Sequence, residues 1–222
     1  MLLSDQGILV AIKKGDIVVE NFDEKFLQPA SYDMRLGEQT ATKDGPLNIR
    51  EKGVLRISPG EFVAVTTLEF VKVSNKNAGT IGLKSKFARL GVILLAGPQI
   101  DPGFEGILQM GLVNLGPNPV ALGYAESFCT VQFFELETEV SHPYSGPFQG
   151  LRTIHPDVIR SITTEAVTLD QVLKVLTSLS ENVSKLSSEV SKVVSAMNTI
   201  KWAVAVFLPL IATIAVAALL RR

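Results

Sequence analysis

The sequence contains few of the residues that mark disulfide-rich or strongly charged proteins. Its single cysteine, Cys129, excludes an internal disulfide bond and is typical of a reducing compartment. Because Cys129 lies in an apolar run, we expect a buried side chain rather than a nucleophile. A formal net charge of −1 gives no indication of a nucleic-acid partner. Charged residues break the N-terminal apolar runs, so we expect no signal peptide.

No stretch between residues 55 and 136 keeps a helical period. Short apolar runs alternate there with Gly, Pro and Asn, among them FVAVTTLEFVKV, ILQMGLV and FCTVQFFEL. Such a pattern is typical of a compact all-β barrel or jelly-roll. Near the N-terminus, Ser4 and Gly15 can cap a short helix over residues 5–14.

Two polar stretches interrupt the β-like runs at the centre of the chain. The first carries Lys84, Ser85, Lys86 and Arg89, and the second is IDPGFEG, which contains Asp101. A lone acid beside Pro and Gly is usually turn chemistry, and a lone surface cation is usually only solvated. A cationic stretch followed by an acidic turn instead predicts an anion site with a general base.

Three motifs in this order resemble the superfamily that contains dCTP deaminases and trimeric dUTPases. They are LQPASYDMRLG, LKSKFARLGV and IDPGFEG, and the resemblance, which is greatest to the deaminase branch, covers residues 1–150. It implies a dUTPase-like distorted jelly-roll or β-barrel head that assembles as a homotrimer with active sites between subunits. It also implies a deoxynucleoside triphosphate ligand, dUTP or dCTP, with Mg²⁺ bound through its phosphates and not directly by the protein.

The resemblance also implies roles for individual residues. Asp101 matches the aspartate that activates the attacking water in dUTPases, and Phe104 matches the aromatic residue that packs on the deoxyribose. Lys84 stands where the family has a phosphate-binding arginine, so the charge is kept without the bidentate fork. The full set implied to bind nucleotide is Lys84, Ser85, Lys86, Arg89, Phe104, Tyr144 and Gln149.

Several positions depart from the family pattern. The deaminases carry a proton-transferring glutamate ten residues after the aspartate, whereas this chain has Gly111. Loss of a general acid–base group typically costs on the order of 10²–10⁴ in rate. Pro147 and Leu151 replace a lysine and a glutamine of the C-terminal motif that closes on the nucleotide. For Asp33, a structural acceptor is the better interpretation than catalysis.

The C-terminal third has a different pattern. Apolar residues recur there at spacings of three and four: Leu169, Val172, Leu176, Leu179, Val183, Leu186, Val190, Val193, Met197 and Ile200. More than four heptads predict a long α-helical coiled coil. One amphipathic helix packed on the head is the alternative. The Val and Leu core residues are typical of dimers in model peptides, whereas a trimeric head would gather three helices.

The last stretch, WAVAVFLPLIATIAVAALL, contains no charged residue. At about 1.5 Å per residue it nearly spans the ~30 Å apolar core of a bilayer. It therefore predicts a single transmembrane helix over residues 202–220, a C-terminal anchor that would hold the protein at a membrane with a cytoplasmic head. A buried helix is the alternative.

These patterns predict a dCTP deaminase/dUTPase-like domain over residues 1–153, a linker over 154–167, a coiled-coil stalk over 168–201 and the anchor. The leading functional hypothesis is a membrane-anchored dUTPase-type hydrolase that converts dUTP to dUMP and pyrophosphate. A non-catalytic nucleotide sensor or membrane scaffold is the second hypothesis. A dCTP deaminase forming dUTP is the third, since Gly111 opposes it.

Overall fold

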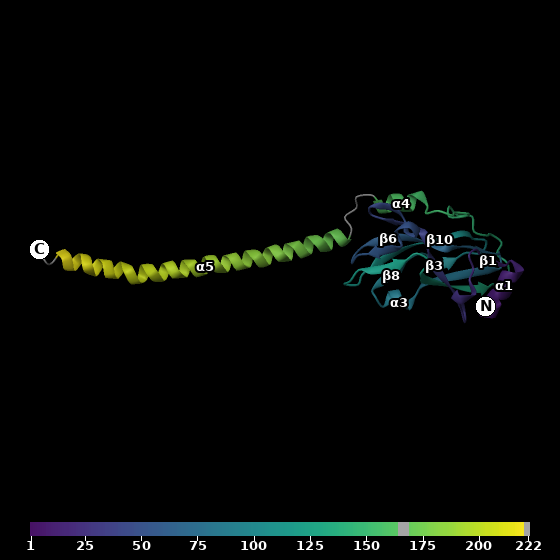
Figure 1. Ribbon diagram of the computed structural model, residues 1–222, viewed down its shortest axis with the longest axis horizontal. Coiled ribbons are helices and arrows are strands. Elements are labelled where there is room, and N and C mark those ends of the chain that lie inside the picture. The colour runs from purple at the N-terminus through teal and green to yellow at the C-terminus, as the bar shows by residue number, and fades with distance from the viewer. Residues whose placement is uncertain (164–168, 220–222) are drawn as a thin grey trace. The chain divides into compact units, whose positions relative to one another are not determined.

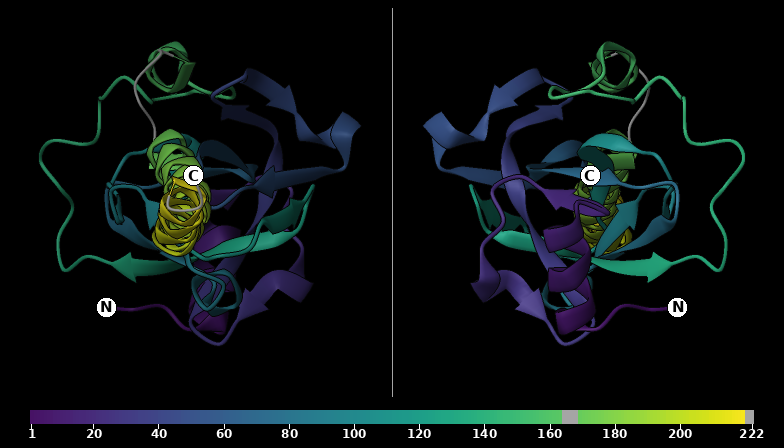
Figure 2. Two further views of the ribbon diagram at one scale, coloured as in Figure 1. Left: turned by 90° about the vertical axis from the view of Figure 1, so that its left-hand side faces the viewer. Right: turned by 90° about the vertical axis from the view of Figure 1, so that its right-hand side faces the viewer.

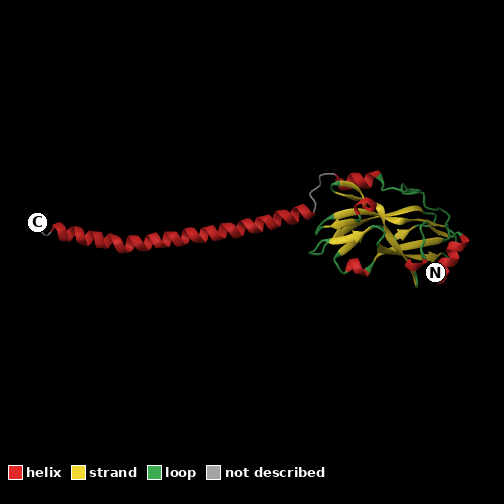
Figure 3. Cartoon of the chain, viewed as in Figure 1, coloured by secondary structure: helices red, strands yellow, loops and turns green. Residues whose placement is uncertain are grey.

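The computed structural model describes residues 1–163 and 169–219, without the side chains of residues 169–171, 203, 206, 208 and 210–219. The chain divides into two compact units, Met1–Asp170 and Gln171–Arg222. The first unit is the β-rich head, and the second is one long helix; Figure 3 colours them by secondary structure.

The head contains short helices and many strands, labelled in Figure 1. The helices are α1 (Asp5–Lys14), η1 (Glu24–Phe26), α2 (Ile49–Lys52), α3 (Ser85–Ala88) and α4 (Pro156–Thr163). The strands are β1 (Ile17–Val19), β2 (Leu27–Gln28), β3 (Ser31–Thr42), β4 (Gly45–Asn48), β5 (Val54–Ile57), β6 (Phe62–Val73), β7 (Asn77–Leu83), β8 (Val92–Leu95), β9 (Gln99–Ile100), β10 (Glu105–Asn114), β11 (Val120–Gly123) and β12 (Ser127–Glu135).

One antiparallel sheet forms most of the head. Its strands follow the order β8-β10-β6-β3-β12-β7-β9, with β1 paired to β6 and with β2 and β4 paired to β3; β11 and β5 form a separate pair. The sheet bends at β3, whose first half pairs with β12 and whose second half pairs with β6. Figure 2 shows the strands curving in this way. The prediction of a β-rich head is confirmed.

One face of β10 contributes to the hydrophobic core. Along β10, Leu108, Met110 and Leu112 are buried in it, so Gln109 and Gly111 face the other way, because successive strand residues point to opposite faces. Cys129 is also buried, as predicted, and burial raises the pKa of its thiol well above the usual value.

Local signals set the first helix as the sequence indicates. The Ser4 side chain accepts a hydrogen bond from the backbone nitrogen of Gly7 at 3.2 Å, and Gly15 ends the helix with a φ of 79°. That conformation suits glycine, and its backbone N–H bonds the last carbonyls of the helix. The predicted helix over residues 5–14 is therefore confirmed.

Helix α4 covers part of the outer face of the sheet. Val158, Ile159 and Ile162 pack against Ala41 of β3 and Ala64 of β6, together with the nearly buried Ile154. Figure 1 shows α4 alongside β6. Residues 154–163, which were expected to form a linker, therefore pack on the head.

The second unit is formed by α5 (Leu169–Leu219). Among the described residues, no helix is long and apolar enough to cross a membrane. Over residues 172–201, Ser, Thr, Lys, Glu and Asn separate the apolar side chains of α5, which makes this part amphipathic. Because no described helix could cross a membrane, the predicted transmembrane anchor over residues 202–220 is wrong. The membrane localisation that depended on this anchor is wrong as well. Residues 220–222 lie outside the described residues.

Candidate functional site

The acidic turn borders a cavity of about 180 Å³. Asp101 follows β9, is solvent-exposed and lines this cavity. Two residues on, Gly103 has a φ of 83°, and a Cβ there would lie 2.6 Å from Pro143 Cβ. The turn therefore needs glycine at this point, both for its backbone conformation and for the close approach of a distant segment. The full lining is Ile81, Ala96, Gly97, Gln99, Ile100, Asp101, Phe104, Ile107, Leu108, Gln109, Tyr144 and Phe148.

Aromatic side chains form one wall of the cavity. The rings of Phe104 and Tyr144 lie edge to face, with centroids 5.5 Å apart. Phe148 completes this wall; it fits the family's C-terminal motif but was not among the residues expected to bind nucleotide. An apolar wall opposite an exposed carboxylate suits a ligand with a flat or sugar-like body and a reacting polar group. Of the predicted site residues, Asp101, Phe104 and Tyr144 line this one cavity.

Tyr144 and Phe148 of this wall come from a segment far along the chain, which we term the closing segment (residues 143–155). The backbone nitrogen of Tyr144 donates to the carbonyl oxygen of Pro102 at 2.8 Å. Gln149 donates through Nε2 to the Gly103 carbonyl at 2.9 Å and accepts through Oε1 from the Glu105 backbone nitrogen at 3.1 Å. The Gln149 amide therefore joins the closing segment to the acidic turn, next to the cavity but outside its lining.

The closing segment continues along the outer face of the sheet. The Gln109 side chain donates to the Thr153 carbonyl at 2.9 Å and accepts from the His155 backbone nitrogen at 2.8 Å. Gln39 accepts from the Ile154 backbone nitrogen at 3.0 Å. Figure 2 shows the chain between β12 and α4 running outside the strands. The sequence did not predict that Gln109 fastens this segment, although a lone amide within ILQMGLV was a signal for a structural role.

Strand β10 carries no side chain at Gly111, the position where the deaminases carry their glutamate. Gly111 pairs with Ala64 of β6 and Leu95 of β8. A Cβ built on Gly111 would lie 2.4 Å from Phe62 Cε2 and 3.3 Å from the Leu95 carbonyl oxygen. Real Cβ atoms do not come this close to carbon. The Phe62 ring therefore occupies the space that a side chain at position 111 would need.

The basic stretch lies around α3 and does not line the cavity. Lys84 forms an ion pair with Asp33, and Lys86 pairs with Glu126 at 2.6 Å. Asp33 is thus a structural acceptor, as interpreted from the sequence. Ser85 begins α3 and Arg89 ends it, and both are exposed. Within one chain, the predicted phosphate-binding residues and the predicted catalytic acid therefore belong to separate surfaces.

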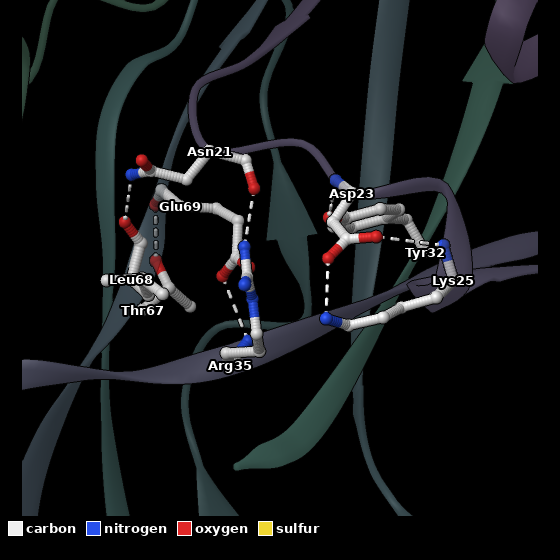
Figure 4. Close-up of polar contacts among 8 residues, drawn as sticks. All are labelled: Asn21, Asp23, Lys25, Tyr32, Arg35, Thr67, Leu68 and Glu69. Carbon is white, nitrogen blue, oxygen red and sulfur yellow. Dashed lines mark hydrogen bonds and ion pairs between the residues drawn. The ribbon is translucent and has the colours of Figure 1, made fainter. Parts of the chain in front are cut away.

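Another polar cluster surrounds Arg35 and Glu69 (Figure 4). Arg35 donates through its backbone nitrogen and Nε to the two Glu69 carboxylate oxygens at 2.9 and 2.6 Å, and it also donates to the Asn21 carbonyl. Burial raises the pKa of the Glu69 carboxyl, although hydrogen bonds and charge from Arg35 act in the opposite direction. The cluster ties β3, β6 and the loop after β1 together, which is a structural role.

The site offers no direct set of metal ligands. In the described part of the chain, no group of three or more His, Cys, Asp or Glu side chains could hold a metal ion. Magnesium usually keeps several waters and binds through substrate phosphates with only one or two carboxylates. Asp101 is the carboxylate of the cavity lining, so it is the residue there that could contact such an ion.

Comparison with known proteins connects this geometry to nucleotide metabolism. The sequence profile of a family described as dCTP deaminase-like matches residues 2–136. The dCTP deaminase of Pyrococcus furiosus is 36% identical over 150 residues, which are 68% of this chain and 92% of that protein. The "dCTP deaminase, dUMP-forming" of Aquifex aeolicus is 30% identical over 171 residues, covering 72% of this chain and 95% of that protein.

A solved structure supports the fold alone. The 2′-deoxycytidine 5′-triphosphate deaminase from Agrobacterium tumefaciens superposes with a TM-score of 0.51 at 17% sequence identity. The match covers 59% of this chain and 46% of that one. At such low identity, the likeness extends to the arrangement of strands and to no residue of the site.

Proposed function

This chain belongs to the dCTP deaminase-like family, and from that premise we propose that it hydrolyses a deoxynucleoside triphosphate, dUTP for preference, to the monophosphate and pyrophosphate. The observation that carries the proposal is the contrast between two positions ten residues apart in the sequence. Asp101 is present and solvent-exposed at the cavity. Gly111 has no proton-transferring group, and Phe62 fills the space beside it.

The chemistry at the cavity follows from these residues. Asp101 accepts a proton from a water molecule as that water attacks the α-phosphorus. The bond from the α-phosphorus to the bridging oxygen breaks, and pyrophosphate leaves. The Phe104 ring packs on the deoxyribose and leaves no polar partner for a 2′-hydroxyl, which favours deoxyribose. Magnesium, when bound through the phosphates, supplies neutralisation of the charge that develops on them.

The phosphates need cations that the cavity lining does not contain. Lys84, Lys86 and Arg89 lie on the separate surface around α3. We propose that the chain is a homotrimer in which this surface of one subunit meets the cavity of its neighbour. Lys84 and Lys86 would then exchange part of their pairing with Asp33 and Glu126 for contacts to phosphate.

A nucleotide sensor without turnover is the second candidate. It is favoured because the Gln149 amide already bonds two backbone groups and because two of the cations are paired with carboxylates. The cavity is also small beside the roughly 300–1,000 Å³ of typical ligand sites. Deamination of dCTP ranks third despite the names of the relatives, since nothing at position 111 can move a proton to the base.

The test uses the full chain with Mg²⁺ and either dUTP or dCTP, with pyrophosphate and ammonia measured separately. Hydrolysis predicts pyrophosphate from dUTP that falls by about 10²–10⁴ in Asp101→Asn while nucleotide binding persists. Asp44→Asn is the matched control, because Asp44 is also an exposed turn aspartate and does not line the cavity. Binding with no product supports the sensor. Ammonia from dCTP contradicts the argument from Gly111.

A further inference from the structure

Apolar side chains form one exposed stripe along α5. From Val172 to Ile200, the residues at alternating spacings of three and four are between 41% and 63% exposed. Over about 42 Å of helix, at 1.5 Å per residue, none of these described side chains is buried. So long a stripe left in water is unfavourable, which points to a partner.

The spacing of the stripe selects the kind of partner. Spacings of three and four sustained over whole heptads keep the seam facing a second supercoiled helix. Helices that lie on a membrane surface usually have a polar face rich in Lys and Arg and an opposite face with Trp or Phe. Between residues 172 and 200, the polar residues of α5 are mostly uncharged Ser, Thr and Asn, with Lys174, Lys185 and Lys192 as the cations. The stripe therefore fits another helix better than a lipid surface.

The residues that flank the stripe determine which helix can pair with it. In coiled coils the flanking e and g residues select partners and orientation by charge. Here those positions hold Leu173, Ser180, Ser187 and Val194 on one side and Val175, Asn182, Glu189 and Ala196 on the other. Two copies placed parallel and in register bring Glu189 beside Val194 of the second copy. No like charges then face each other across the seam, and no flanking charge demands a different partner.

From these observations we propose that α5 binds the α5 helix of other copies of this chain, in parallel and in register, along residues 172–200. The interaction needs neither the cavity nor a nucleotide, so it stands independently of the proposed hydrolysis. Its consequence is that the heads are gathered at one end of a shared helical stalk.

Disulfide trapping in the full chain tests this arrangement. Val193→Cys places a thiol on the stripe, and Ser195→Cys is the control two residues along, at a position that points away from the seam. The native Cys129 is fully buried and stays out of the reaction. With a copper–phenanthroline oxidant, Val193→Cys should form interchain disulfides on the order of ten times faster than the control, because paired helices hold the thiols at millimolar effective concentration.

Additional variants distinguish the parallel pair from an unpaired helix, an antiparallel pair and a different partner protein. Adding Leu179→Asp and Leu186→Asp to Val193→Cys should abolish the fast trapping, while the β-rich circular dichroism of the head is retained. Equal rates for Val193→Cys and Ser195→Cys would overturn the proposal. An antiparallel pair would instead link Val193→Cys chains to Leu176→Cys chains and leave Val193→Cys alone unlinked, which also overturns it. Trapping of Val193→Cys to a different protein would do the same.

Discussion

The contact between Gly111 and Phe62 predicts how Gly111→Ala changes the free energy of unfolding. The sign of that change should depend on whether the Phe62 ring is present. A Cβ at position 111 would lie 2.4 Å from Phe62 Cε2 and 2.8 Å from Phe62 Cζ. Both atoms are the far end of a side chain that is 37% exposed, so the ring can turn toward solvent, and relieving the overlap should cost about 1–2 kcal/mol, the lower part of the range for overpacking. Replacing a glycine in a strand by alanine stabilises the folded state by roughly 0.5–1 kcal/mol, because the unfolded chain loses conformational entropy. Gly111→Ala should therefore lower the free energy of unfolding by up to about 1 kcal/mol.

Removing the ring should reverse that result. In a Phe62→Ala background the overlap is gone, and the nearest of the remaining atoms is the Leu95 carbonyl oxygen, 3.3 Å from the Cβ. Gly111→Ala should then raise the free energy of unfolding by roughly 0.5–1 kcal/mol. The four proteins of this double-mutant cycle are the wild type, Gly111→Ala, Phe62→Ala and the double variant. Urea unfolding followed by far-ultraviolet circular dichroism measures the free energy of unfolding of each. Equal effects of Gly111→Ala in both backgrounds would refute the argument that Phe62 occupies this space.

Three further predictions follow from the head. Ile154→Ala should lower the free energy of unfolding by about 2–4 kcal/mol, because Ile154 is 4% exposed beneath α4. Val10 is exposed, so Val10→Ala should change this free energy little, and urea unfolding compares the two variants. A raised folded-state pKa at Glu69 means that its contribution to stability is complete below its ordinary value of 4.5 and is lost as pH rises through the folded pKa. The urea midpoint should show this decline, and Glu69→Gln should lack it while being less stable throughout, since its amide has one acceptor oxygen. Cys129 should not react with a thiol reagent at pH 8 until the protein unfolds, as absorbance can follow, because burial raises the pKa of the thiol and blocks access.

The sequence alone determined the features that depend on neighbouring residues. Ser4 and Gly15 predict α1 because a cap acts on its own first or last turn. The short runs between Gly and Pro predict the strands, and the Asp101 turn with Phe104 predicts one part of the site, since these residues lie within a single loop and strand. The heptads predict the helix of α5, although its pairing is still a proposal.

Only the tertiary structure decided the features that join distant residues. Phe62 fills the space at Gly111 across 49 positions, Gln109 fastens residues 153–155, and Lys84 pairs with Asp33. The expected linker packs on the sheet for the same kind of reason, because Ile154 and α4 find an apolar surface formed by β3 and β6. Composition and spacing report local conformation, whereas the packing of a side chain depends on which strands the fold places beside it. The identity of a residue at a site can therefore be predicted from sequence before its neighbours can.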